Sequence, residues 1–476
     1  MEEFNTKKKQ TVRKRSPKLL IDILPTLVFC LLFVLHINQI ITFLFLSDKQ
    51  TLHITVKAKH GETDTCAGRY IYIHNLPSRF NDDLIKNCEA YAELRNKCKY
   101  LVNSGFGPKI LEDDHNHTTR VLTTETGSWY STNQFMLEVI FREKMRHYEC
   151  LTNDSSRSSA VFVPFYAGFD VRRFWGYSVK LRDQLGEDLA QWLRERPEWS
   201  KMYGRDHFFV TGRVGRDFRR VSDQDSDWGN KLMRLPEFEN MTMLSIETNC
   251  WSNEFAVPYP TYFHPERRIE VKRWQRKVRK MERRYLFSFV GAPRPEMEES
   301  IRGEIIRQCL ASQGKCKFLN CETLSKDCGD PVKVMEVFQD SVFCLQPPGD
   351  TPTRRSTFDS ILAGCIPVFF NPDSVYSQYK WYFPKDHTKY SVYVPEEDVK
   401  NGKVIIEKLL VEISKERILS MRNEVEKIIP MIIYTKPGAV GPDKIEDAFE
   451  IAVSKVLERV SLFQDNATDR SSYYII

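Results

Sequence analysis

The sequence predicts an α/β protein with two domains, each built on a parallel sheet, behind one N-terminal transmembrane helix. Three observations carry this prediction. Residues 23–46 form a run of 24 positions without Asp, Glu, Lys or Arg. Strand-like and helix-like segments alternate in two series, and a basic segment separates the two. A chain of 476 residues has room for two or three domains.

The apolar run, taken as an anchor at 21–46, follows a basic tail at 1–20. About 20 apolar residues cross a bilayer, and the run is too long for a cleavable signal peptide. Seven Lys/Arg and two Glu in the first 18 residues leave only +1 of the net charge of +6 to the rest. The basic tail therefore stays in the cytosol, and the body after a polar stem at 47–65 lies in the lumen. A buried core helix is the alternative.

The first domain is expected to span 66–270. Strands are expected at 69–77, 159–165 and 206–212, and helices at 134–148 and 181–194. The strands are β-branched and aromatic or continuously apolar, as in a buried parallel sheet. The helices carry apolar residues at helical spacing. A nearly neutral body excludes a nucleic-acid-binding domain, which needs a basic excess of its own.

A basic linker at 271–284 separates this domain from the second one, at 285–465. Residues 267–284 hold ten Lys/Arg in eighteen positions, typical of an exposed linker helix or a basic face. The expected strands are 285–291, 341–345 and 366–370, and the expected helices are 296–310, 356–363, 404–411 and 444–460. Residues 466–476 form a tail.

Cysteines and glycosylation sequons agree with a lumenal body. One of the twelve cysteines, Cys30, lies in the anchor. The cysteine clusters 88/98 and 309/316/321/328 are typical of disulfide partners. Eleven cysteines lie outside the anchor, and because this number is odd, at least one thiol is free or paired between chains. The spacing disfavours a zinc site. Sequons begin at Asn116, Asn153, Asn240 and Asn466.

The densest chemical signal is residues 343–368, which follow the order strand, turn, helix, Gly, strand. Two adjacent cations, Arg354 and Arg355, stand where a helix begins, although the helix dipole is already positive there. This makes sense when an anion binds between them, because a helix N-terminus with hydroxyls and Arg is a phosphate site. Asp359, four residues on, is placed to accept from ribose hydroxyls. The alternative is solvated arginines with a surface Arg355–Asp359 pair.

Other patterns are weaker. Gly291 and Arg294 follow the first strand of the same half, where an ordinary turn is equally compatible. The alternating carboxylates of 223–227 fit a solvated acidic loop better than a divalent-cation site, since no complete calcium-loop pattern follows. Phosphate-binding P-loop and dinucleotide-binding glycine patterns do not occur in the sequence.

Five segments together resemble the exostosin-type glycosyltransferases of family 47, and most closely their plant branch, the KATAMARI-like xyloglucan galactosyltransferases. The segments are YIHNLP at 72–77, FVPFYAG at 162–168, GRDHF at 204–208, DSDWG at 225–229 and the block 343–370. The resemblance covers residues 66–460.

The resemblance implies a type II, single-pass Golgi membrane enzyme of GT-B type, with two Rossmann-like domains facing a cleft. The first domain would be the acceptor side, and the second would bind the nucleotide sugar. It would transfer galactose from UDP-galactose to a xyloglucan acceptor with inversion, without cofactor or metal, alone or in a complex with other wall glycosyltransferases. The predicted donor-binding residues are Gly291, Arg294, Gly349, Asp350, Thr351, Arg354, Arg355, Ser356 and Asp359.

Inversion needs a base for the acceptor hydroxyl. Glu138, Asp206 and His207 are the candidates, and the sequence does not decide between them. For Asp206 and His207 the alternative is a hydrogen-bonded pair at a strand start, and for Glu138 it is a charge on a helix face. Two other functions stay open: the same fold with a uronic acid or pentose donor, and a non-catalytic glycan-binding subunit.

Overall fold

The computed structural model describes residues 64–111, 121–122, 127–174, 176–322, 327–439 and 441–472, with side chains to residue 464 in the last helix. The predicted tail, anchor and nearly all of the stem lie outside these residues. Across the described ranges, no helix combines the length and the apolar composition that a membrane crossing requires.

The first half is built on a six-stranded sheet in the order β2-β1-β3-β4-β5-β6, in which all neighbours are parallel. Its strands are β1 (Ile71–Ile73), β2 (Leu151–Thr152), β3 (Ala160–Phe162), β4 (His207–Val214), β5 (Thr242–Glu247) and β6 (Glu254–Ala256). Every residue of β3 and β5 is buried, which explains their lack of polar alternation.

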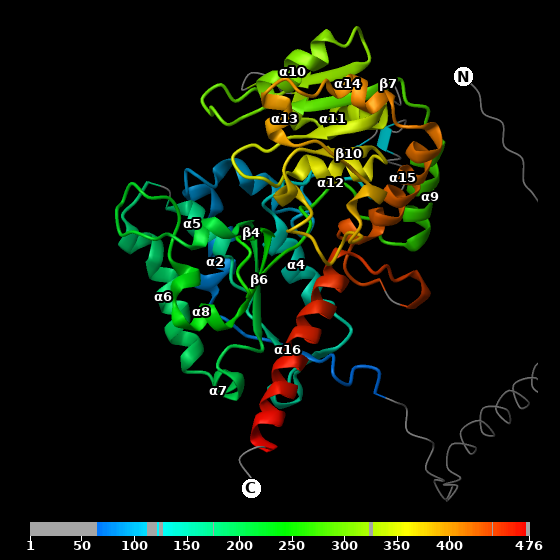
Figure 1. The fold of residues 1–476 in the computed structure, drawn as a ribbon. Coiled ribbons are helices and arrows are strands. Elements are labelled where there is room, and N and C mark those ends of the chain that lie inside the picture. The colour runs from blue at the N-terminus through cyan, green and yellow to red at the C-terminus, as the bar shows by residue number, and fades with distance from the viewer. Residues whose placement is uncertain are drawn as a thin grey trace, which may run out of the picture. The chain divides into compact units, whose positions relative to one another are not determined.

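Six helices of the described part of the first half lie around this sheet (Figure 1). They are α2 (Asp82–Lys86), α4 (Leu137–Arg146), α5 (Ala167–Arg173), α6 (Val179–Arg194), α7 (Pro197–Met202) and α8 (Pro236–Asn240). Helix α9 (Arg268–Lys280) follows them in the chain and lies beside α15 (Lys415–Ile428) of the second half. The predicted helices at 134–148 and 181–194 correspond to α4 and α6. Helix α6 buries one mainly apolar stripe, as its spacing predicts, whereas α4 is buried on nearly all sides, its charged residues Glu138, Arg142 and Lys144 included.

The second half holds a five-stranded, fully parallel sheet in the order β11-β10-β9-β7-β8. Its strands are β7 (Tyr285–Gly291), β8 (Cys316–Asn320), β9 (Ser341–Gln346), β10 (Ile366–Phe369) and β11 (Val392–Tyr393). Its helices are α10 (Arg302–Ala311), α11 (Pro331–Gln339), α12 (Arg355–Leu362), α13 (Glu396–Lys400), α14 (Ile406–Val411) and α15 (Lys415–Ile428). The prediction of two parallel α/β halves is confirmed.

The basic linker is helix α9, and only one of its faces is exposed. Val271, Trp274 and Val278 are buried, and the Trp274 indole donates to the Leu362 carbonyl at the end of α12 over 2.8 Å. Several cations of α9, among them Lys272, Arg273 and Arg276, point to solvent. The helix therefore ties the second half to the first while presenting a basic face.

The last helix, α16 (Ala448–Ser472), crosses back to the first half. It packs against β3, and the Phe449 ring lies 4.7 Å from the Phe141 ring of α4 (Figure 1). The predicted second domain, 285–465, includes most of this helix, which contacts both β3 of the first sheet and the second-half segment Ile429–Ile432. Local sequence does not show the first of these contacts, because β3 lies far from α16 in the chain.

Buried polar contacts join the halves, and residues Cys66–Ile476 form one compact unit. Lys144 of α4 forms a buried ion pair of 2.8 Å with Asp447. The Gln378 side chain exchanges hydrogen bonds with the backbone of Thr248, and the Tyr379 hydroxyl donates to the Ile246 carbonyl. The crevice between the sheets is thus held by fixed partners on both sides.

The described residues contain five disulfides: Cys66–Cys150, Cys88–Cys98, Cys309–Cys316, Cys321–Cys328 and Cys344–Cys365. The two predicted clusters pair internally, as expected. Cys250 is the free, exposed cysteine of the described residues, which agrees with the odd count.

Candidate active site

A cavity of about 750 Å³ lies between the two halves, at the carboxyl ends of their strands. Arg213 and Val214, at the end of β4, line one side, and Asp350 to Arg354, on the loop after β9, line the other. A second cavity of about 310 Å³ shares Phe135, Arg213 and Asp350 with the first, so the two adjoin. Open parallel sheets bind their ligands at this edge.

The loop after β9 presents a cation whose hydrogen-bonding groups are incompletely used. Arg354 is the residue just before α12, and its guanidinium lies across Gly349, where a Cβ atom would be 1.4 Å from Nη2. Its Nε and Nη2 have no hydrogen-bond partner among the described residues, and burial lowers its pKa. A buried cation with unused donors is suited to an anion that enters the cavity.

Two more arginines stand beside Arg354. Arg294 pairs with Asp350 at 3.2 Å. Arg302, at the start of α10, donates to the carbonyls of Pro348 and Ala292. Burial, followed by the charges of Arg354 and Arg294, lowers the pKa of Arg302 to about 10. Arg302 was not among the predicted donor-binding residues. Like Arg354, it is a cation at the start of a helix, so the same sequence signal could have identified it.

Arg355 and Asp359 are placed differently from the prediction. Arg355 faces the first half, where it donates to the Thr132 carbonyl and lies 3.7 Å above the Tyr262 ring. Its Nε is 3.1 Å from the Asp359 carboxylate, which is buried and whose pKa burial raises to about 6. Neither residue lines the cavity, because Tyr262 and the Thr132 carbonyl hold the guanidinium away from it.

The other predicted donor residues divide into two groups. Thr351 and Asp350 line the cavity. Ser356 donates to the Gln346 side chain over 2.6 Å instead, and Gly291 ends β7 where a Cβ atom would collide with the Phe289 ring. Gly291 is therefore required for packing within its own half.

The first half positions this loop through Glu247, a residue that the sequence analysis did not single out. Its buried carboxylate, at the end of β5, accepts from both the backbone N–H and the hydroxyl of Thr353. The Tyr259 hydroxyl lies 3.0 Å from the Thr353 hydroxyl. Arg354 is thereby oriented by contacts that come from the opposite sheet.

Of the three base candidates, Glu138 lies nearest the cavities, although it lines neither of them. It stands in the first turn of α4, is 2% exposed, and accepts from the backbone N–H of Gly168, which lines the second cavity. Burial raises its pKa to about 7, against the opposing effect of hydrogen bonds from Gly168, Phe169, Gly212 and Thr211. One carboxylate oxygen, Oε2, has no partner among the described residues. A carboxyl group that titrates near neutrality is suited to proton transfer.

Asp206 and His207 lie at the opposite end of β4. The His207 Nδ1 is 2.7 Å from the Asp206 carboxylate, and its Nε2 is 3.1 Å from His74 Nε2. The six steps along the chain from His207 to Arg213 span about 20 Å of the strand. This geometry favours a buried hydrogen-bonded pair at a strand start over a role at the cavity.

A comparison with protein families gives this site its context. The model of the exostosin GT47 domain matches residues 65–409.

The chain belongs to the exostosin GT47 family.

It is a glycosyltransferase, and three similar proteins are named as xyloglucan galactosyltransferases or probable ones. "Probable xyloglucan galactosyltransferase GT13" of Arabidopsis thaliana is 82% identical over 98% of this chain and 99% of its own length. "Probable xyloglucan galactosyltransferase GT12" is 59% identical over 97% of this chain and 96% of its own length. "Xyloglucan galactosyltransferase MUR3" is 47% identical over 88% and 67%. Both come from the same plant. Among solved structures, a chain of the GtfA/B complex gives a TM-score of 0.32 at 8% sequence identity. The match covers 68% of this chain and 61% of that one.

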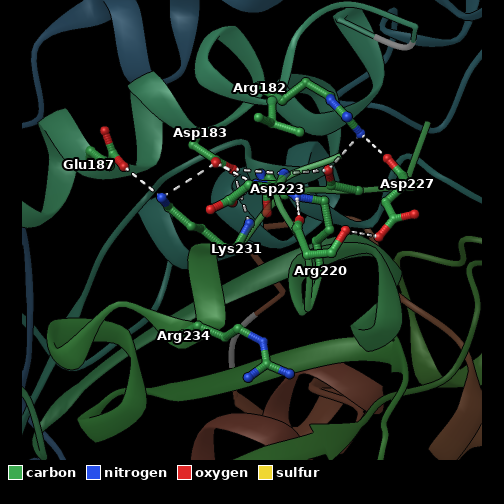
Figure 2. A network of polar contacts seen from close by, with 12 residues as sticks. Arg182, Asp183, Glu187, Arg220, Asp223, Asp227, Lys231 and Arg234 are labelled. Atoms are coloured by element: carbon green, nitrogen blue, oxygen red, sulfur yellow. Dashed lines mark hydrogen bonds and ion pairs between the residues drawn. The ribbon is translucent and has the colours of Figure 1, made fainter. Parts of the chain in front are cut away.

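In this glycosyltransferase the acidic segment 223–227 is part of the cavity wall. Figure 2 shows how arginines hold it: Arg220 forms two hydrogen bonds with Asp183 and a longer contact with Asp223, and Arg182 donates to the carbonyls of Asp225 and Asp227. The segment was predicted to be a solvated loop. Asp223 does face solvent, but the backbone of the segment is anchored because the Arg182 guanidinium donates to two of its carbonyls.

The predicted glycosylation sites fall in different surroundings. Asn153 and Asn240 are exposed. Asn116 and the side chain of Asn466 lie outside the described residues. The two exposed sites are accessible to a glycan without any change in the fold.

Proposed function

We propose that this glycosyltransferase transfers galactose from UDP-galactose to xyloglucan side chains, with inversion, in a GT-B arrangement of its two halves. The observation that carries the proposal is Arg354, which is buried, lies over Gly349, and presents unused donors at the cavity. The 82% identity to a relative named as a xyloglucan galactosyltransferase supports the choice of sugar and acceptor.

In the proposed reaction the donor diphosphate lies against Arg354 and Arg294, and the sugar lies toward Glu138. The oxygen of the acceptor hydroxyl forms a bond to the anomeric carbon from the face opposite the phosphate. The bond from that carbon to the phosphate oxygen breaks, and its electron pair leaves with UDP. The hydroxyl proton goes to Glu138, and the arginines stabilise the charge on the departing UDP. These roles need no metal, so we propose metal-independent turnover.

A donor panel tests the proposal. The full-length chain is incubated with galactose-free xyloglucan and, in turn, with UDP-galactose, UDP-glucose, UDP-galacturonic acid and a UDP-pentose, with and without excess EDTA. We expect one hexose to be added from UDP-galactose only, with or without EDTA, as read by mass. Transfer of a uronic acid or pentose would overturn the donor assignment. UDP binding without any transfer would indicate a glycan-binding subunit, and loss of activity in EDTA would contradict metal independence.

We also propose that the enzyme is a single-pass type II protein of the Golgi membrane with its body in the lumen. The apolar run at 23–46 behind a basic tail supports this topology. Five disulfides in the described body support an oxidising compartment. Protease added to sealed microsomes should trim only the N-terminus, and digestion of the whole body would refute the topology.

A further inference from the structure

The wall of the cavity opposite Arg354 carries positive charge that the reaction outlined above does not use. Arg213, the next-to-last residue of β4, lines both the larger and the smaller cavity. Lys97 and Arg172 line the smaller cavity beside it. Arg172 pairs with Glu93 at 2.7 Å, whereas the described residues contain no carboxylate in ion-pair contact with Lys97. Three cations of the first half thus surround a space in which Asp350 is the acidic lining residue.

Arg213 is held in a fixed position. Its Nε donates to the Asp217 carboxylate over 2.8 Å, and its guanidinium lies 4.6 Å from the Phe135 ring and 5.8 Å from the Trp228 ring. Asp217 is in turn fixed, because it also accepts from the Trp228 indole. The side chain held in this way lines both cavities, and a preorganised guanidinium fork suits a phosphate better than a flexible ammonium group does.

Arg213 also stands next to the proposed base. A Cβ atom on Gly168 would lie 2.7 Å from Arg213 Cγ and 2.7 Å from Glu138 Oε1, so both side chains pack on this glycine. Arg213 therefore contacts the same glycine as the proposed base and lines the same two cavities as Asp350 of the loop after β9.

Like charges around one cavity repel one another, and an anion relieves this repulsion. From the second half, Arg354 lines the larger cavity, and the charges of Arg294 and Arg302 lie close to it. On the first half, burial and then the charges of Arg172 and Arg213 lower the pKa of Lys97. The positive charges of the two halves therefore face one cavity from both sides, and a ligand with two phosphates matches that arrangement better than a neutral sugar alone.

We infer that Arg213, assisted by Lys97, is the first-half contact of the nucleoside diphosphate, and that it stabilises the departing UDP from the side opposite Arg354. The inference rests on the proposed donor site. It adds a catalytic residue from the half that the sequence analysis assigned to the acceptor. Donor binding then requires both halves at once, which the fixed contacts between them allow.

The test compares Arg213→Met, Arg213→Lys and the matched control Arg205→Met in the full-length chain. Arg205 is an exposed arginine at the other end of β4. Calorimetry with UDP and initial rates with UDP-galactose and xyloglucan are the readouts. We expect Arg213→Met to weaken UDP binding at least tenfold and to lower kcat by about 10²–10³, the usual cost of losing one such donor. Arg213→Lys should recover part of both, and the control should match the wild type.

The outcomes separate this inference from the proposed function. If Arg354→Ala binds UDP as the wild type does, the donor site itself is wrong. If Arg354→Ala loses UDP but Arg213→Met keeps wild-type affinity and kcat, or changes only the KM for xyloglucan, this inference alone is overturned. Should Arg213→Met fail to fold, Lys97→Met decides: we expect UDP binding to weaken about two- to fivefold, the effect of one partly exposed charge, and unchanged binding would contradict us.

Discussion

Replacing Glu138 with Gln is expected to lower kcat by about 10²–10⁴, the usual contribution of a positioned general base, while UDP affinity stays close to the wild-type value. The amide is nearly isosteric with the carboxyl group, so the hydrogen bond from the Gly168 N–H can persist while proton acceptance is lost. Initial rates at saturating donor and acceptor, together with UDP calorimetry, measure the two effects separately.

The same residue sets the expected pH dependence. Burial raises the pKa of Glu138 to about 7, and a base acts only when it is deprotonated. We therefore expect kcat/KM of the wild type to rise as pH increases through about 7 and then to level off, and Glu138→Gln to lose this rise.

Asp206→Asn serves as the comparison, because it changes another buried carboxylate of the same half at the far end of β4. This variant should keep the rise with pH. If Asp206→Asn loses the rise of kcat/KM with pH and Glu138→Gln keeps it, the base is Asp206, and our choice of Glu138 is refuted.

Replacing Arg354 with Ala is expected to lower kcat by about 10²–10³ and to weaken UDP binding. The departing UDP gains negative charge in the transition state, and a preorganised cation in a closed cavity stabilises it most when that charge develops. Arg354→Lys keeps the charge but not the planar fork, so it should recover only part of the loss. Calorimetry with UDP and turnover with UDP-galactose give both quantities.

Gly349→Ala is an independent way to disturb the same contact, since it removes no charge. The added methyl group would overlap the Arg354 guanidinium, so the side chain must move. We expect a loss of UDP affinity that approaches that of Arg354→Ala. Arg307→Ala, which removes an exposed arginine of the same half whose partner is Glu304, should have no effect on UDP binding. Wild-type UDP affinity in Arg354→Ala would exclude the phosphate site.

Much of the fold could be predicted from local sequence because most residues of several buried strands are apolar or aromatic. Residues 285–291 are apolar or aromatic apart from Ser288 and Gly291, and they form β7 over the same span. Strand β5, Thr242–Glu247, was missed, since Thr, Ser and Glu interrupt its apolar residues, yet all six residues are buried. Its polar side chains are tolerated inside because they have partners from elsewhere, as Glu247 has in Thr353.

The candidate site was predictable on one side only. The cations at the start of α12 pointed to Arg354 because a positive side chain at a helix N-terminus is locally unfavourable. The same rule selected Arg355 equally, and nothing in the neighbouring residues shows that Tyr262 and the Thr132 carbonyl take up that guanidinium instead. Which of the two arginines lines the cavity depends on their directions in space: Arg355 packs against the first half, and Arg354 lines the cavity.

Local sequence was enough to predict the two parallel α/β halves, the family, the cysteine clusters that pair, and the loop that presents Arg354. Each of these depends on residues close together in the chain, through periodicity, spacing or a helix end. The three-dimensional structure was needed to show that Glu138 lies near the cavities while Asp206 and His207 do not, that Arg213 and the loop after β9 line one cavity, and that α16 contacts the first sheet. These facts depend on burial and on partners that lie many residues away, and a side chain's charge and pKa follow from what surrounds it in space.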